Sequence, residues 1–130
     1  MSIHKAGKRK TAIARATLTS GKGRVRVNHV LLDAYEPKLY KLKIMEALML
    51  AGDTAKEVDI DIDVNGGGMM SQAEAARLAI GRCLVEYAPK LKVDFVAYDR
   101  NFVVADVRAK EQHKPNCHGT ARGRKQKSYR

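Results

Sequence analysis

Residues 58–74 read VDIDIDVNGGGMMSQAE, and this stretch decides the fold. Up to Val64, β-branched residues alternate with aspartates, and a period of two predicts a strand with one apolar and one acidic face. The glycines that follow predict a turn, and the small residues after them predict a helix. We therefore expect a strand, a tight turn and a helix in direct succession.

The aspartates also suggest a calcium loop. Positions one, three, five and six of an EF-hand pattern are filled by Asp61, Asp63, Asn65 and Gly66. Position twelve is Gln72 in place of the bidentate glutamate, position eight is a glycine, and no helical pattern precedes the loop. We interpret the aspartates as the solvent face of a half-buried strand.

The helix is predicted to begin at Ser71, because Ser71 and Glu74 fit the S-x-x-E capping box. It should run to about Tyr87, where Ala88-Pro89 ends it. Small residues would let its backbone lie close to a sheet. They are Ala73, Ala75, Ala76, Ala79 and Gly81.

The Gly66-Gly67-Gly68 turn has two interpretations, and the sequence leaves both open. Exposed backbone N–H groups beside a helix N-terminus form a concavity that binds anions, so a phosphate would fit there. Alternatively, the glycines only permit a tight turn. The run is neither a Walker loop nor a dinucleotide fingerprint, because the required lysine and glycine spacing are missing.

On the N-terminal side, residues 11–28 read TAIARATLTSGKGRVRVN and predict a hairpin closed at Gly21-Lys22-Gly23. Its second strand would place Val25 and Val27 on an apolar face and Arg24 and Arg26 on a basic one. Residues 33–37 are typical of a turn or a short helical piece. Residues 38–52 predict a helix capped by its final glycine, with a core-facing stripe. The stripe comprises Leu42, Met45, Leu48 and Met49.

On the C-terminal side, residues 90–99 predict a short helix or an extended run, and residues 102–105 (FVVA) predict a last strand. Asp106 closes the apolar part of the chain. The segment that follows has almost no apolar residues and cannot form a core of its own. With 130 residues, we expect one globular domain over residues 1–107 and a tail over residues 108–130.

The positive charge gathers at the two ends of the chain. The sequence has 25 Lys and Arg against 14 Asp and Glu, a net charge of +11. Residues 1–15 hold five basic side chains and no acid, and residues 108–130 hold eight against one glutamate. The 12 basic and 13 acidic residues left for 16–107 make a nearly neutral body.

Basic ends on a neutral body are typical of a protein that binds a phosphate backbone. The alternative is a charged tail that only keeps the protein soluble. An anionic lipid surface is disfavoured, because the tail offers few apolar residues to insert and no segment is long and apolar enough to span a membrane. The start of the chain lacks an apolar signal run, so we expect a cytoplasmic protein.

Cysteines and histidines do not indicate a metal or catalytic site. Cys83 lies in the predicted second helix and is expected to be a small buried residue. Cys117 is flanked by His113 and His118, but structural zinc needs four ligands and no second pair is present in the sequence. No nucleophile with a placed base appears either, so we expect neither an enzyme nor a cofactor, metal or small-molecule substrate.

Six motifs, in order, carry a resemblance that runs nearly end to end. They are GKRKTAIARA (7–16), GKGRVRVN (21–28), VNGGGMMSQAEAARLAIGRCLVEY (64–87), YDR (98–100), HKPN (113–116) and RKQKSYR (124–130). Together they resemble the family of the ninth protein of the small ribosomal subunit. The terminal Ser-Tyr-Arg is similar to the archaeal and eukaryotic branch.

The resemblance implies an α+β fold with a four-stranded mixed sheet covered by helices and a left-handed βαβ crossover, similar to the second domain of ribosomal protein five. It also implies a structural role in translation, in the head of the cytoplasmic small subunit. The implied partners are small-subunit ribosomal RNA, neighbouring ribosomal proteins and P-site tRNA, whose anticodon stem-loop the tail would approach. A free-standing RNA chaperone or nonspecific RNA-binding protein is the alternative.

The site residues follow from the resemblance and from the charge pattern. The expected tRNA-proximal residues are Lys127, Ser128, Tyr129 and Arg130. The expected rRNA-binding residues are Lys5, Lys8, Arg9, Lys10, Arg15, Lys22, Arg24, Arg26, Gly66, Gly67, Gly68, Arg108, Lys110, Lys114, Arg122, Arg124 and Lys125. Arginine can hold a phosphate with two donors, and a thin glycine- and lysine-rich strand can enter RNA junctions.

Overall fold

The computed structural model describes residues 1–116, 119–121 and 128–129 of the chain. A mixed five-stranded sheet has the order β1-β2-β5-β3-β4. The strands are β1 (Ser2–Arg9), β2 (Ala12–Ser20), β3 (Val25–Val27), β4 (Val30–Leu31) and β5 (Val58–Asn65). The helices are α1 (Lys38–Ala51), α2 (Met69–Tyr87) and α3 (Leu91–Tyr98), with short 3-10 turns η1 (Leu32–Ala34), η2 (Gly52–Lys56) and η3 (Arg100–Phe102).

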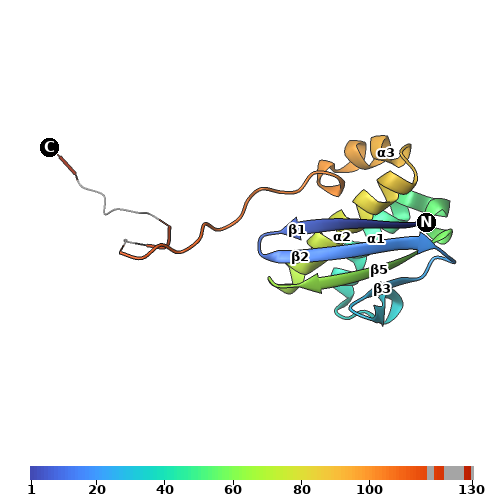
Figure 1. Cartoon of the computed structure of the whole chain (residues 1–130), viewed down its shortest axis with the longest axis horizontal. Helices are drawn as coiled ribbons and strands as arrows, with labels where there is room; N and C mark the ends of the chain where they lie inside the picture. The colour runs from blue at the N-terminus through green and yellow to red at the C-terminus, as the bar shows by residue number, and fades with distance from the viewer. Residues whose placement is uncertain (117–118, 122–127, 130) are drawn as a thin grey trace.

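The helices α1 and α2 lie on one side of the sheet, and the sheet presents its other side to the viewer in Figure 1. The α+β class is confirmed. None of the helices in the described residues combines the length and hydropathy needed to span a membrane.

The predicted strand, turn and helix are confirmed as β5, the Gly66–Gly68 turn and α2. In β5 the four apolar residues from Val58 to Val64 are buried, whereas Asp61 and Asp63 are exposed and Asp59 is half-buried. The buried residues of β5 lie beside those of β2, with Ile60 opposite Leu18 in the antiparallel register. The aspartates therefore belong to a strand, as the alternation predicted.

The predicted hairpin between residues 11 and 28 is wrong, because β5 lies between β2 and β3. β5 pairs with β2 from Ile13 to Ser20 in an antiparallel ladder and with the three residues of β3 in a parallel one. The Gly21–Gly23 connection passes the start of β5, where Gly23 N donates to the carbonyl of Val58 at 3.1 Å. The eight-residue β5 offers β2 a full ladder, which three-residue β3 cannot.

The sheet has five strands instead of the expected four, and their positions differ. β1 comprises the basic N-terminal run and pairs with β2, and β4 adds a two-residue edge. Residues 102–105 do not form the predicted strand, because Phe102 ends η3 and is buried in a stack with Phe95 at 5.2 Å. The parallel strands β3 and β5 are connected through α1; the left-handed sense of this crossover stays a prediction.

The predicted capping box is wrong, because α2 begins two residues earlier than Ser71. Gly68 is its N-cap and no side chain caps it. Glu74 turns instead toward β1 and accepts a hydrogen bond from Arg9 Nε at 2.8 Å. The close packing expected of α2 is confirmed, since its alanines are buried and a side chain at Gly7 of β1 would overlap the carbonyl of Ala75.

The helix predicted over residues 38–52 is confirmed as α1 with Gly52 at its C-cap. Of its predicted core stripe, Met45 and Leu48 are partly buried against the core, but Leu42 and Met49 are not. Leu42 and Met49 are 46% and 65% exposed. The buried residues are Ile44, Ala47 and Ala51. Ala47 and Ala51 on this face let α1 pack close to α2, and longer side chains such as Met45 and Leu48 pack at the edge of the core.

Candidate nucleic-acid interface

Strand alternation divides the basic N-terminal run between the two faces of the sheet. Lys5 and Arg9 lie opposite buried Ala16 and Ala12 and therefore face the helices, whereas Lys8 points to the open face. Lys5 forms an ion pair with Glu86 of α2, and Arg9 forms one with Glu74. A single run in the sequence thus becomes two groups of cations with different partners.

The predicted basic face of β3 is matched by the acidic face of β5. Arg26 donates to both carboxylate oxygens of Asp61, at 2.6 and 2.9 Å, and Arg24 Nη2 lies 3.3 Å from Asp59. Backbone N–H donors of Arg24 and Lys22 lower the pKa of Asp59. The parallel register places Arg26 beside Asp61, and Arg24 contacts Asp59 just before the ladder begins, so both arginines have their charge compensated.

Lys10, Thr11 and residues 66–68 form one end of the sheet, which we call the turn end. The backbone there requires glycine at two of the three positions from 66 to 68. Gly66 and Gly67 have positive φ angles of 77° and 65°. A Cβ at Gly66 would lie 2.8 Å from the carbonyl oxygen of Thr11, and one at Gly67 would lie 2.9 Å from Ala12 Cβ. The tight-turn interpretation therefore has a physical basis at both positions.

Gly68 differs from its two neighbours. Its φ is −96°, a value open to any residue, and no atom lies within 4 Å of a Cβ built there. It also stands at the N-terminus of α2, where backbone N–H groups are unpaired in a helix. Neither backbone conformation nor crowding therefore requires a glycine at this position.

Two exposed cations lie at this same end. Lys8 and Lys10 are exposed on either side of the β1 terminus, and Lys10 occupies the turn with a φ of 53°. Within the part of the chain that the structure describes, neither lysine forms an ion pair, in contrast to Lys5, Arg9, Arg24 and Arg26. The turn end therefore combines free positive charge with the N-terminus of α2.

The C-terminal tail also starts at the turn end. The base of the tail is held there by Arg9, whose Nη1 donates to the carbonyl of Arg108 at 3.1 Å. From residue 107 to residue 116 every side chain is exposed, and Figure 1 shows this segment running away from the sheet. Lys110 and Lys114 lie on it. Of the predicted tRNA-proximal residues, Ser128 and Tyr129 are exposed.

Several predicted residues lie outside the described part of the chain. They are Cys117, His118, Arg122, Arg124, Lys125, Lys127 and Arg130. In the described part there is no group of three or more His, Cys, Asp or Glu able to hold a metal ion. Cys83 is buried as predicted, and its burial raises the pKa of the thiol to about 11.

Comparison with known proteins shows the family of the chain. Residues 7–130 match the family described as "Ribosomal protein S9/S16". The chain belongs to this ribosomal protein S9 family. It is 48% identical to the "Small ribosomal subunit protein uS9" of Methanococcus vannielii over 131 residues and 47% identical to that of Methanococcus maripaludis, covering 98% of both chains in each case. The S9 family is a structural, non-enzymatic component of the ribosome. The resemblance and its archaeal-like branch are confirmed.

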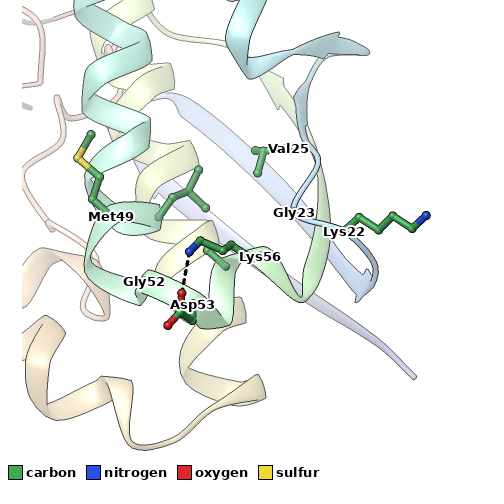
Figure 2. Close-up of a pocket in the computed structure, with 9 residues that line it drawn as sticks. Lys22, Gly23, Val25, Met49, Gly52, Asp53 and Lys56 are labelled. Atoms are coloured by element: carbon green, nitrogen blue, oxygen red, sulfur yellow. Dashed lines mark hydrogen bonds and ion pairs between the residues drawn. The ribbon is translucent and has the colours of Figure 1, made fainter.

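The hollow at the opposite end of this S9-family fold has a different character. It measures about 460 Å³ and lies between the Gly21–Gly23 connection and the C-terminal end of α1. Lys56 is paired with Asp53 at 2.7 Å, and Lys22 extends away from the hollow (Figure 2). Val25 and Met49 give it an apolar lining. Without a free cation directed into it, this hollow is a poor site for phosphate.

Sequence reasoning missed two arginines that hold the S9 fold together. Arg77 is only 5% exposed, pairs with Glu46 of α1 and with Asp99, and lies 4.4 Å from the centre of the Phe102 ring. Arg82 donates to the carbonyls of Ala6 and Val103 at 2.7 and 3.0 Å. The only sequence signal was an arginine among the small residues of α2, since the partners come from other elements.

Proposed function

We propose that this S9-family chain is a structural constituent of the small ribosomal subunit that binds rRNA through the turn end of its sheet and P-site tRNA through its tail. The observation that carries the proposal is the meeting of Lys8, Lys10, the helix N-terminus at Gly68 and the base of the tail at one end of the molecule. The names of the archaeal relatives supply the assembly.

The rRNA contact rests on uncompensated charge. A lysine that replaces a condensed counterion on RNA adds affinity that depends on salt, whereas an arginine already paired with a carboxylate has less to offer. Lys8 and Lys10 combine this free charge with a position beside the N-terminus of α2, which adds oriented N–H groups for a phosphate, and they therefore carry the greatest weight. The other expected rRNA-binding residues stay predictions.

The tRNA contact rests on the reach and chemistry of the tail. The 22 residues that follow Arg108 span up to about 75 Å when extended, at roughly 3.3–3.6 Å per residue. An exposed tyrosine such as Tyr129 can stack on a base or sugar, which is worth about 1–3 kcal/mol. A chain of this kind can enter an RNA junction that excludes a folded domain. We place the chain in the subunit head, in the cytoplasm, beside neighbouring ribosomal proteins.

Truncation of the tail tests the tRNA contact. Small subunits carrying a chain that lacks residues 127–130 should sediment normally but retain P-site tRNA less well than subunits with the full chain, measured by filter binding at matched salt. Equal retention would count against a tRNA role. Sucrose gradients at high salt test the assembly, since a free-standing RNA chaperone would leave the subunit and spread over many RNAs.

A further inference from the structure

Three charged side chains join the turn end of the sheet to the base of the tail. Arg9 Nε donates to Glu74 Oε2 of α2 at 2.8 Å, and Arg9 Nη2 lies 3.6 Å from Asp106 Oδ2. Arg9 Nη1 also donates to the backbone carbonyl of Arg108. The side chains of Arg9 and Asp106 are only 16% and 15% exposed. We call Arg9, Glu74 and Asp106 the Arg9 clamp.

The clamp holds the chain where regular structure has already ended. After η3 ends at Phe102, residues 105–114 belong to no helix or strand. Asp106 is fixed on its other side by Arg108, whose backbone N–H and guanidinium donate to its carboxylate at 2.7–3.1 Å. Among the described residues, Arg9 makes the only hydrogen bond and the only ion pair that connect residues 106–108 to a distant part of the chain. Without Arg9, no hydrogen bond or ion pair within the described residues would hold this segment to the sheet.

We infer that Arg9 is a positioning residue that fixes where and in which direction the tail leaves the folded domain. The inference rests on the proposed function, in which the tail must reach a distant RNA target. A tail that starts from a fixed point searches fewer directions, so less conformational entropy is lost when its end binds. Arg9 thus acts on the tail through protein contacts, whereas its neighbour Lys8 is left to contact RNA.

The charges of the clamp allow a test that separates positioning from RNA attraction. Arg9→Gln removes a cation and opens the clamp. Asp106→Asn and Glu74→Gln also weaken it, but they make the protein more positive and so favour RNA binding. Lys8→Gln is the matched control, because it removes one cation from the adjacent residue of the same strand on the opposite face of the sheet. In the isolated protein, where no RNA is bound, a less fixed tail direction shared by the first three variants and absent in Lys8→Gln identifies the clamp.

The direct measurement is the spread of distances between spin labels on the isolated protein. Labels at Lys92→Cys of α3 and Gln112→Cys of the tail, in a Cys117→Ser background, report the exit direction; both label positions are exposed and Cys83 is buried. We expect the distance distribution to broaden at least twofold in Arg9→Gln and Asp106→Asn and to stay unchanged in Lys8→Gln. An unchanged distribution in Arg9→Gln, or equal broadening in Lys8→Gln, would overturn the inference.

Two further comparisons keep the outcomes distinct. Circular dichroism confirms that each variant is folded, and Glu74→Gln replaces Arg9→Gln if the latter does not fold. In small subunits, the clamp variants should retain P-site tRNA less well than a Lys90→Gln control, which removes one exposed cation away from the turn end. If truncation of residues 127–130 has no effect on tRNA, the proposed function fails, while the label distances still decide whether Arg9 positions the tail.

Discussion

The proposed function predicts that Lys8 and the lysine of the turn end, Lys10, bind RNA and that charge elsewhere does not substitute for them. We consider the double variant Lys8→Gln/Lys10→Gln. Both side chains are exposed and lack an ion pair within the described residues, so each is free to replace one counterion on RNA. The fold should remain intact, because neither side chain contributes to the core.

The size of the expected change in RNA affinity follows from counterion release. Each lost phosphate contact reduces the slope of log K against log salt by about 0.7–0.9, so two lost contacts reduce it by about 1.4–1.8. When salt is raised from 50 to 200 mM, the affinity of both proteins for RNA falls. The fold-decrease for the wild-type chain should be about 7–12 times the fold-decrease for the variant. The assay is a salt titration of the isolated protein on a small-subunit rRNA fragment from the head.

The control is Lys90→Gln/Lys92→Gln, which removes the same net charge from exposed positions at the start of α3. Its salt slope should stay close to that of the wild type. If both double variants reduce the slope equally, RNA responds only to net charge, and the argument that the turn end is the interface is refuted.

Other consequences concern stability and the glycine turn. Arg77→Met should reduce the free energy of unfolding by about 3 kcal/mol, the lower end of the range for breaking a buried ion pair. The reduction stays at the lower end because the two carboxylate partners are about a third exposed and regain water. A reduction below about 1 kcal/mol in urea unfolding would contradict this. Gly67→Ala should destabilise the fold by crowding the β1–β2 turn, whereas Gly68→Ala should fold normally and weaken rRNA binding; equal melting temperatures for the two would refute the contrast. The pKa values of Asp59 and Asp106 are lowered in the fold, so the stability they contribute is present above their ordinary value of 3.8 and is lost as the pH falls below it. Unfolding measured from pH 6 to pH 2 should show this decline, and a smaller decline in Asp59→Asn.

The parts of the fold that sequence patterns predicted well are those set by local periodicity. β5 alternates at every position, and α2 follows a glycine turn with a run of helix-forming small residues. Where two patterns competed, tertiary contacts decided. Glu74 fits a capping box, but its carboxylate accepts a hydrogen bond from the Arg9 guanidinium, and α2 begins at Met69. The hairpin failed because strand pairing depends on a segment more than thirty residues away.

For the site, the sequence by itself determined the amount of positive charge, its concentration at the two ends of the chain and the family. These properties are sums or ordered motifs, and they do not depend on which elements become neighbours. Only the tertiary structure decided which cations remain free. Strand alternation turned Arg9 toward α2 and Lys8 toward solvent, and the insertion of β5 placed an aspartate beside Arg26. An ion pair between distant segments requires both groups within a few ångströms, and only packing of the chain brings them there.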